Sequence, residues 1–420
     1  MSPSNRCIMH IDCNSAFLAF SAAHRLQQGD SLDLRTIPSA VGGNPETRHG
    51  IILAKSIPCK AFNIQTGETL HAAFQKCPTL VIVPPDYPLY VKCSNAMMEI
   101  IKDFSPAYQK FSIDEIFLDY TNMQKHFGHP VDAAHKIKDR IKNELGFTVS
   151  IGISSNKLLA KMASDLKKPD AVTTLYPEEM AQKMWPLDIQ DLFMIGPCTA
   201  PKLRAMGINT IGELAAADLN LIRYRLKSHG ELIYNYAHGI EASLVHTGKH
   251  IDMKGIGNSS VIPFDVDDRL TAHQILLSLT ETVAMRLRDA ACVARLISVS
   301  VRDTNFRTYS HQRKIFSATD STNEIYRIAR DLFDEAWQGE ALRHFGVRVS
   351  ELCSNEFQQT SFFDDVHKEK NQALDRAIDS LRFRFGSTSV HRAGFLNSGI
   401  KPLMGGIGST DEMSVMTSIL

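Results

Sequence analysis

Two neighbouring carboxylates stand in an apolar, β-prone stretch of this chain. Residues 111–119 read FSIDEIFLD, so Asp114 and Glu115 separate two hydrophobic runs. A buried ionised carboxylate is tolerated only when it is paired or bound to a metal. Side chains alternate along a strand, so both carboxylates share one face only where the chain turns. Two structures fit this segment: a hairpin that directs both side chains toward one cation site, or an ordinary turn with an exposed acidic pair.

A third carboxylate follows a short apolar run near the N-terminus. Residues 7–11 read CIMHI, which predicts a buried strand, and Asp12 ends it. Together with Asp114 and Glu115, Asp12 offers all-oxygen ligation, which suits Mg²⁺ or Mn²⁺ better than zinc. Carboxylates that hold two such ions form the clamp used for in-line displacement at phosphorus.

Length and composition set the frame for these residues. A chain of 420 residues has room for about two to four domains, and its 44% hydrophobic and 22% charged residues are those of a globular protein. The formal net charge of +0 does not indicate a nucleic-acid partner, although a basic groove can coexist with an acidic back. Its 8 scattered cysteines and the absence of a long apolar run predict a soluble cytoplasmic protein with reduced thiols.

The two acidic segments together resemble the palm of the Y-family translesion DNA polymerases, in the DNA polymerase IV-like branch. The matching stretches are MHIDCNSAF at residues 9–17 and FSIDE at residues 111–115, and the resemblance runs from about residue 7 to about residue 352. It implies an α+β multidomain right hand with a ferredoxin-like palm, small fingers, a helical thumb and an α+β little finger. The implied activity is template-directed addition of dNTPs to a primer 3′-hydroxyl, with an open site and low fidelity.

The resemblance also divides the chain. We expect the palm at residues 1–31 and 81–173, the fingers at 32–80, the thumb at 174–245, a linker at 246–258, the little finger at 259–352 and a tail at 353–420. The run VIV at residues 81–83 predicts a strand that returns to the palm. Helices at about 87–104 and 131–145 would then cover a mixed sheet.

Roles for the acidic residues follow from the resemblance. Asp12 and Asp114 would hold the nucleotide-side metal, helped by the backbone carbonyl of Cys13. Glu115 and the same aspartates would hold the second metal, which lowers the pKa of the primer 3′-hydroxyl. Asn14 replaces a second aspartate that is common in the family, and we expect activity to survive this change because that residue is not a principal ligand.

Nucleotide-binding residues are implied in three segments. They are Ser15, Ala16 and Phe17 after the first strand, Lys55 and Lys60 in the fingers, and Lys168. Phe17 matches the family's steric gate, an aromatic ring that crowds the 2′ carbon of the incoming sugar, although a core phenylalanine is the alternative. The family's usual hydroxyl, tyrosine and arginine fall here on Ala54, Ile57 and Lys60, and lysine cannot replace arginine in a bidentate phosphate contact.

A helix predicted after Asn156 carries lysines at helical spacing. Lys157, Lys161 and Lys168 would share one face, which could present ammonium groups to phosphate or simply be a solvated surface. Lys168 is the strongest candidate, because the sequence Lys-Pro-Asp at residues 168–170 is similar to the family's Lys-Pro-Asn.

Two further regions are implied to bind DNA. Residues 193–214 resemble a helix-hairpin-helix, whose glycine turn brings backbone N–H groups to a phosphate without sequence readout. Its candidate contacts are Ile195, Gly196, Thr199 and Lys202. In the little finger the candidate contacts are Arg302, Arg307, Arg313 and Lys314, which could track a DNA backbone.

The tail contains a short aromatic segment. Residues 359–363 read QTSFF, similar to the peptide by which bacterial polymerases dock on the sliding clamp. Gln359 and Ser361 would bind at the rim of an apolar pocket that receives Phe362 and Phe363. Residues from about 368 to 385 indicate a basic amphipathic helix.

The expected partners are primer-template DNA, dNTPs and the sliding clamp, with no membrane. We expect a monomer in the cytoplasm, at the nucleoid when it works. A catalytically silent, clamp-tethered repair scaffold of the same fold is the alternative, although three mutually repelling acids are hard to explain in a scaffold. A nucleotidyl cyclase with a palm-like fold is a third hypothesis, which the helix-hairpin-helix and the clamp peptide disfavour.

Overall fold

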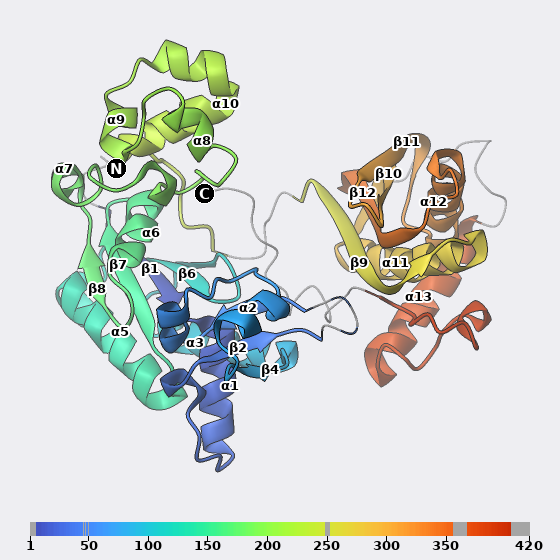
Figure 1. Ribbon diagram of the computed structural model, residues 1–420, viewed down its shortest axis with the longest axis horizontal. Coiled ribbons are helices and arrows are strands. Elements are labelled where there is room, and N and C mark those ends of the chain that lie inside the picture. Colours follow the sequence, from blue (N-terminus) through green and yellow to red (C-terminus); the bar gives the residue numbers. More distant parts are fainter. Residues whose placement is uncertain are drawn as a thin grey trace. The chain divides into compact units, whose positions relative to one another are not determined.

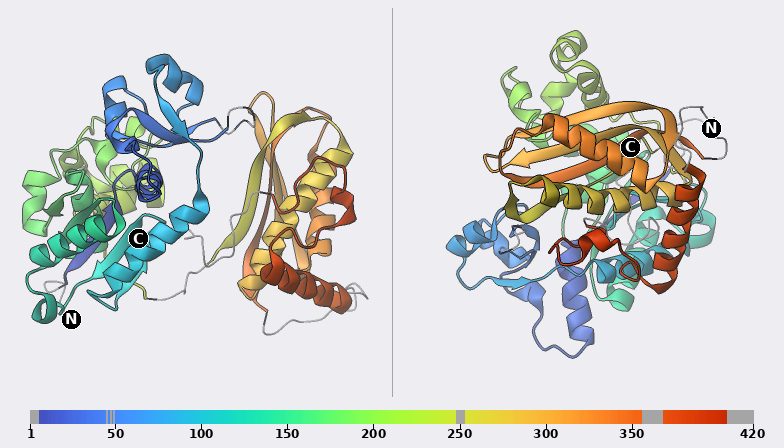
Figure 2. Two further views of the ribbon diagram at one scale, coloured as in Figure 1. Left: turned by 90° about the horizontal axis from the view of Figure 1, so that it is seen from below. Right: turned by 90° about the vertical axis from the view of Figure 1, so that its right-hand side faces the viewer.

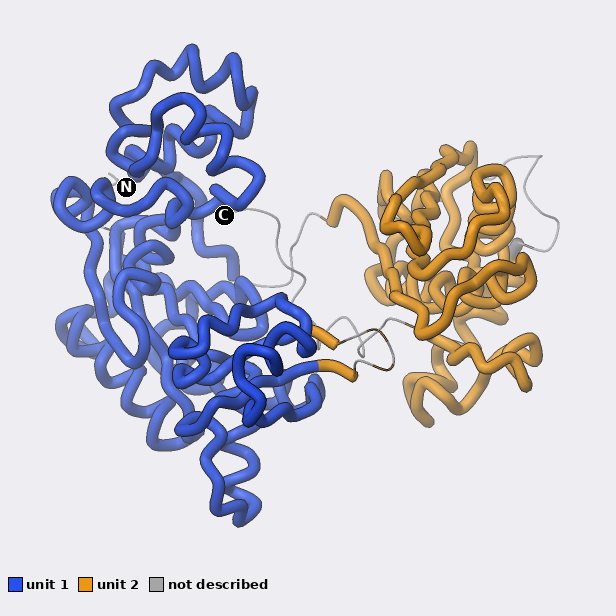
Figure 3. The backbone as a smooth tube through the Cα atoms, viewed as in Figure 1, with its two compact units in different colours: residues 1–42, 52–250, 414–420 blue, residues 43–51, 251–413 orange. Residues whose placement is uncertain are grey.

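The computed structural model describes residues 6–44, 46, 48, 50–247, 253–355 and 368–404. The chain forms two compact units, one of residues 1–42, 52–250 and 414–420 and the other of residues 43–51 and 251–413 (Figure 3). Within the described ranges, no helix is long and apolar enough to cross a membrane.

The first unit is built around a five-stranded sheet in the order β5-β6-β1-β7-β8 (Figure 1). Its strands are β1 (Ile8–Cys13), β5 (Tyr108–Lys110), β6 (Glu115–Asp119), β7 (Val149–Ser154) and β8 (Val172–Thr174). The helices around it are α1 (Ala16–Gln27), α3 (Tyr87–Lys102), α4 (Gln124–Phe127), α5 (Pro130–Leu145) and α6 (Lys157–Leu166). All six residues of β1 are buried, as expected for the central strand of a sheet with helices on both faces.

Strand β1 presents a different set of side chains to each face. Met9 and Ile11 pack in the core formed with α1, α3 and α5, whereas Ile8 packs with Ala160 of α6. Because side chains alternate, His10 and Asp12 lie on the α6 face with Ile8. The sheet therefore directs Asp12 toward helix α6.

A glycine in β7 allows α6 to lie close to the sheet. A Cβ at Gly152 would stand 2.0 Å from the carbonyl oxygen of Ala160 and 2.3 Å from the amide nitrogen of Ser164. Any larger residue would push α6 away from the strand. This close approach positions the side chains of α6 against the acidic end of β1.

A second, three-stranded sheet has the order β3-β2-β4. It consists of β2 (Ser39–Gly42), β3 (Ile52–Lys55) and β4 (Val81–Val83), with α2 (Leu70–Lys76) and the 3₁₀ helices η2 (Leu34–Thr36) and η4 (Ile57–Phe62) beside it. The prediction that residues 81–83 return to the palm sheet was wrong, because β4 runs parallel to β2. Val83 packs with Leu18 and Val41, and Ile82 packs on the other side, so both faces of this short strand find apolar partners here.

Short helices follow the large sheet. They are η5 (Pro177–Glu179), α7 (Met180–Lys183), η6 (Ile189–Asp191), α8 (Ala200–Arg204), α9 (Ile211–Ala215) and α10 (Leu219–Ala237). Thr210 and Glu213 form a capping box at the start of α9, where the Thr210 side chain accepts from the Glu213 amide at 3.1 Å. A separate apolar core holds these helices together and includes Leu158 and Leu159 of α6.

The second unit is a four-stranded antiparallel sheet in the order β11-β10-β12-β9, with helices on one face (Figure 2). Its main elements are β9 (Gly255–Val266), α11 (Arg269–Asp289), β10 (Cys292–Asp303), β11 (Thr308–Thr319), α12 (Thr322–Ala336) and β12 (Leu342–Ser354). The predicted linker at 246–258 was too long at its C-terminal end, since β9 pairs with β12 from Gly255 onward. Glycine at positions 255 and 257 masked the strand pattern there.

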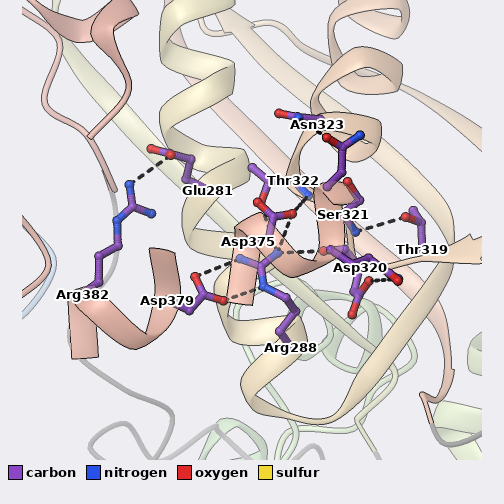
Figure 4. Close-up of polar contacts among 12 residues, drawn as sticks. Glu281, Arg288, Thr319, Asp320, Ser321, Thr322, Asn323, Asp375, Asp379 and Arg382 are labelled. Atoms are coloured by element: carbon purple, nitrogen blue, oxygen red, sulfur yellow. Dashed lines mark hydrogen bonds and ion pairs between the residues drawn. The ribbon is translucent and has the colours of Figure 1, made fainter. Parts of the chain in front are cut away.

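The predicted C-terminal helix is α13 (Lys368–Phe385), and η7 (Ala393–Phe395) follows it. Figure 4 shows how α13 is held: Arg288 of α11 pairs with Asp379 at 2.5 Å and lies 3.4 Å from Asp375. The Asp375 carboxylate also accepts from the Thr322 amide at 2.8 Å, at the first residue of α12. Arg382 pairs with buried Glu281 at 3.1 Å. The charged side of α13 thus faces the domain, because the buried ions of α11 need partners.

Candidate active site

Two of the three predicted carboxylates, those of Asp12 and Glu115, meet at one end of the large sheet. Asp12, in β1, and Glu115, the first residue of β6, are directly opposed across the antiparallel pair. Asp114 precedes β6 in the β5–β6 hairpin, and its carbonyl oxygen accepts from the Cys13 amide at 3.0 Å. The segment is therefore a hairpin whose bend lies beside the end of β1, and the direction of both side chains toward one cation site stays a prediction.

Each carboxylate has one oxygen bound to a fixed donor. Lys168 donates to Asp12 Oδ2 at 2.5 Å, and the Ser112 hydroxyl donates to Asp114 Oδ1 at 2.6 Å. Lys161 donates to Glu115 Oε1. Among the described residues, none donates a hydrogen bond to the second oxygen of any of these carboxylates, which leaves that oxygen available as a ligand for a cation.

Burial dominates the electrostatics of Asp12. Loss of hydration raises the pKa of Asp12 to about 6, against the opposing charge of Lys168. Burial also acts to lower the pKa of Lys168, but its ion pairs with Asp12 and Asp165 outweigh burial and raise this pKa above its usual value. In this structure the ammonium of Lys168 is thus the counter-ion of Asp12.

The donor set suits a hard divalent cation. One ligand atom from each of His10, Asp12 and Glu115 lies within 4.8 Å of the others. His10 lies deeper than the carboxylates, because its Nδ1 is 2.8 Å from the Ser164 hydroxyl and its ring packs on Phe117. Burial, with the charges of Lys161 and Lys168, holds the pKa of His10 well below its usual value, so the ring is neutral. The accessible donors are carboxylate oxygens, as Mg²⁺ and Mn²⁺ prefer.

Asn14 ties three segments together rather than facing a cation. Its side-chain nitrogen donates to the Ser150 hydroxyl at 2.9 Å. Its side-chain oxygen accepts from the Thr148 hydroxyl at 3.1 Å and from the Asp170 amide at 2.9 Å. These hydrogen bonds use the side-chain amide of Asn14, so this residue has a structural role. The asparagine at this position, where the family commonly has an aspartate, removes none of Asp12, Asp114 and Glu115.

A cavity of about 310 Å³ opens beside the carboxylates. It is lined by Cys13, Asn14, Ser15, Ala16, Phe17, Leu53, Ala54, Lys55, Ser56, Ile57, Lys60, Thr66, Asp114, Lys168 and Pro169. All six predicted nucleotide-binding residues are in this set. Two elements far apart in the sequence, the start of α1 and the small sheet, thus form one concave site.

The ring of Phe17 is held on two sides. It stacks on Tyr90 of α3 with centroids 4.6 Å apart and planes at 12°. Tyr87 meets it edge-on at 6.1 Å. Tyr90 is itself buried, with its hydroxyl 3.2 Å from the Ser21 hydroxyl. Phe17 is therefore a rigid wall of the cavity rather than a freely moving side chain.

The two finger lysines differ in their surroundings. Lys55 donates to the carbonyl oxygen of Ile64, just after η4, and this hydrogen bond holds the lysine side chain there. Lys60 lies in η4 with an exposed side chain. Both line the cavity, and Lys60 is the one whose ammonium is free to turn toward a bound anion.

The shared lysine face predicted for α6 was wrong. Helix α6 ends at Leu166, so Lys168 lies beyond it, followed by a cis peptide bond to Pro169. Lys157 and Lys161 are only 1% and 8% exposed. The Lys157 ammonium donates to the Gln109 side chain at 3.2 Å, and Lys161 binds Glu115. The polar partners of both lysines lie inside the fold, which the spacing of charges alone cannot reveal.

In the helical region after the sheet, the predicted DNA contacts surround one turn. Ile195 is buried, so only its backbone can meet a ligand. Gly196 is exposed with open space where a Cβ would stand, and its carbonyl accepts from the Thr199 amide at 3.0 Å. Lys202 in α8 is exposed. This arrangement leaves the backbone of the turn open to a large ligand.

The four predicted contacts of the second unit do not share one face. Arg302 is opposite Thr308, and Lys314 is opposite Leu296. Both lie on the sheet face away from the helices. Arg313 is opposite buried Ile297, on the helix side, and pairs with Glu335 of α12 at 2.5 Å.

Arg307 lies in the β10–β11 turn, where it pairs with Asp303 at 2.9 Å. The open face also carries Arg348, opposite Ser298, which the sequence analysis missed. Alternation along β12 could have identified it. The four residues predicted for the clamp, Gln359, Ser361, Phe362 and Phe363, lie outside the described residues.

Three further residues of the site were missed from the sequence. They are His10, Tyr90 and Ser112. Ser112 carried a signal, because a hydroxyl two residues before an aspartate commonly bonds to it. His10 carried one too, because alternation along β1 puts it on the face of Asp12. Tyr90 reaches the site from α3, so no local pattern points to it, and none points to the pairing of Lys161 with Glu115.

Three family models match the chain. The impB/mucB/samB family matches residues 11–165, its C-terminal domain matches residues 253–362, and the IMS family HHH motif matches residues 177–208. Together they match well over half of the chain.

Curated relatives and solved structures agree with these models. The chain is 44% identical to DNA polymerase IV of Clostridium acetobutylicum over 389 residues, 93% of this chain and 98% of the relative. It is 35% identical to DNA polymerase IV of Acetivibrio thermocellus over 391 residues, 92% of this chain and 96% of that one. A Y-family DNA polymerase chimera has a TM-score of 0.70 at 21% identity, covering 83% of this chain and 100% of its own. DinB from Sulfolobus solfataricus has a TM-score of 0.54 at 21% identity, with 82% and 98% covered.

These likenesses confirm the fold class and activity expected from the two acidic motifs. The solved structures share the α+β right-hand fold, and the helix-hairpin-helix lies where the sequence pattern indicated it. Nothing in the comparisons favours a catalytically silent scaffold. The chain belongs to the Y family of DNA polymerases, in the DNA polymerase IV branch, and is a DNA-directed DNA polymerase of the translesion type.

Proposed function

We propose that Asp12, Asp114 and Glu115, with the backbone carbonyl of Cys13, hold two Mg²⁺ ions during nucleotide addition, and that Mn²⁺ fits the same ligands. The observation that carries this proposal is the meeting of Asp12 and Glu115 across the β1–β6 pair, with Asp114 adjacent. Polymerases of this family are metal-dependent in general. When bound, the ions neutralise charge on the transferred phosphoryl group and lower the pKa of the primer 3′-hydroxyl.

The cavity beside the carboxylates is proposed to bind the incoming dNTP. Backbone amides at the start of α1, at Ser15, Ala16 and Phe17, can approach phosphate oxygens. Lys168 carries a point charge that a triphosphate can attract away from Asp12. Lys55 and Lys60 complete the positive rim, and Lys60 binds phosphate as a point charge rather than as a planar fork.

Removing divalent cations is expected to abolish nucleotide addition reversibly. Primer extension on an undamaged template with dNTPs should stop in excess EDTA and return with added Mg²⁺ or Mn²⁺, because the ligands are oxygens. Zn²⁺ should restore it poorly. A gel-shift with the same primer-template checks that EDTA leaves DNA binding intact. Extension that persists in EDTA would contradict the proposed metal site.

For the domains, we propose a palm that contains the large sheet, fingers that contain the small sheet through Val83, a thumb of helices α7 to α10 and a little finger from Gly255 to Ser354. DNA backbone contacts are proposed for the turn at Gly196 and for the open face with Arg302, Lys314 and Arg348. Arg313 is omitted because it lies on the helix side of the sheet, where it pairs with Glu335. Lys314 lies on the open face, where it pairs with Glu351. Such contacts weaken steeply with salt.

The segment 359–363 is proposed to dock on the sliding clamp, on sequence similarity alone. Replacing Phe362 and Phe363 together with alanine is expected to leave synthesis on short primers unchanged and to remove any gain in product length that added clamp gives, since two aromatic anchors are lost. Primer extension with and without clamp measures both effects. If the clamp still stimulates the double variant, the docking segment lies elsewhere.

The enzyme is also proposed to act as a monomer in the cytoplasm, at the nucleoid while it copies DNA. The location follows from the substrate, and the monomeric state is a prediction that rests on no surface of the fold. Sedimentation of the full chain at several concentrations tests the first part, because self-association would raise the apparent mass with concentration.

A further inference from the structure

Lys161 of α6 lies buried directly behind the carboxylate of Glu115. Its side chain is 10% exposed and forms an ion pair with Glu115 Oε1. The ammonium also lies over the rings of Phe111 at 5.3 Å and Phe193 at 5.4 Å. A buried ammonium is retained only where its surroundings replace the lost water. Two rings and one carboxylate therefore fix the position of this cation.

The hydrogen bonds of His10 show that Lys161 is the donor to this oxygen. The Ser164 hydroxyl donates its one hydrogen to the Lys161 carbonyl at 2.8 Å. The same hydroxyl must then accept from His10 Nδ1, also at 2.8 Å. The other ring nitrogen, Nε2, lies 3.6 Å from Glu115 Oε1, beyond hydrogen-bond distance, and has no hydrogen-bond partner among the described residues. Within the part of the chain that the structure describes, Lys161 is therefore the donor to that oxygen.

The two oxygens of Glu115 thereby acquire different roles. Oε1 is occupied by a donor that the core holds in place. Among the described residues, none donates a hydrogen bond to Oε2. We propose that Lys161 is a positioning residue of the polymerase reaction, which holds Glu115 Oε1 so that Oε2 is presented as a metal ligand. This inference rests on the proposed metal site.

A purely electrostatic role for Lys161 makes the opposite prediction. A positive charge beside a metal site repels the metal, so removing the charge would tighten metal binding. If Lys161 instead orients the ligand, its removal weakens metal binding, as loss of a partner behind a ligand commonly does by about tenfold or more. The sign of the change therefore separates the two roles.

The test compares Lys161→Met with Lys157→Met. Lys157 lies one turn earlier on α6, is also buried and lies 5.7 Å from the Phe117 ring, but it donates to an amide oxygen rather than to a carboxylate. Mn²⁺ binding is measured by electron paramagnetic resonance on the full chain with a dideoxy-terminated primer-template and dNTP, where no turnover occurs. We expect Lys161→Met to weaken Mn²⁺ binding about tenfold and Lys157→Met to leave it unchanged.

Other outcomes overturn the proposal at identifiable steps. Unchanged or tighter Mn²⁺ binding in Lys161→Met refutes the positioning role. The proposed metal site is tested separately by Asp114→Asn. If this variant binds Mn²⁺ as the wild type does, or if the wild type binds none, the proposed metal site itself is wrong. Single-turnover kinetics give a second readout, in which the maximal rate of incorporation falls and the apparent Kd for dNTP stays constant.

A second variant covers the case in which Lys161→Met does not fold. Lys161→Arg keeps the charge but replaces a compact ammonium with a planar fork. The positioning role predicts weaker Mn²⁺ binding in Lys161→Arg, whereas a role of charge alone predicts no change. Thermal unfolding of each variant shows that the compared proteins are folded.

Discussion

Replacing Asp114 with asparagine is expected to lower primer extension on the order of 10³-fold, a loss of about 4 kcal/mol of transition-state stabilisation. The two side chains have the same shape, so the Ser112 contact and the Cys13 amide bond to the backbone can persist. What disappears is the negative charge of a carboxylate that lines the cavity proposed for the dNTP. Single-turnover incorporation of one dNTP measures the effect.

The matched control for Asp114→Asn is Asp119→Asn, at the far end of the strand β6 that Asp114 precedes. Asp119 Oδ1 accepts from the Thr121 amide at 2.9 Å, and its position pairs with Ile8 rather than with Asp12. The control variant should extend primers like the wild type. Both variants should bind primer-template normally in a gel-shift. Normal extension by Asp114→Asn would remove this residue from the metal site.

The second large effect is expected at Phe17. Phe17→Ala should reduce discrimination against ribonucleotides by about 10²-fold, because the pocket loses the wall that excludes a 2′-hydroxyl. The stack on Tyr90 gives the reason for the strength of this wall: the ring has a buried aromatic neighbour at 4.6 Å and cannot yield to a larger sugar. The ratio of kcat/KM for dCTP and CTP opposite template guanine measures the change.

Phe17→Tyr supplies the control, since it keeps the ring and should keep discrimination near the wild-type value. Tyr90→Ala tests the supporting wall, and we expect it to give an intermediate loss. Extension with dCTP should remain measurable in all three variants. A dCTP/CTP ratio that is the same in Phe17→Ala and the wild type would show that another side chain excludes the 2′-hydroxyl.

Local sequence predicted a buried strand that reaches Asp12, as its apolar run shows. For residues 111–119 it left a hairpin and an ordinary turn open, and the pairing of β5 with β6 decided for the hairpin. The helix α5 and the strands of the second unit were likewise predictable, because their apolar residues recur with one clear period.

Only the tertiary structure decided how these elements support the site. Asp12 lies opposite Glu115 because β1 pairs with β6. Strand β4 joins the small sheet rather than the large one because it pairs with β2. Lys161 shows the limit of sequence patterns most clearly. Charged residues at helical spacing predict a solvated face, yet this face of α6 packs on a sheet edge that holds carboxylates. Burial and pairing are long-range properties, because a charge enters the interior only where a distant residue supplies its opposite.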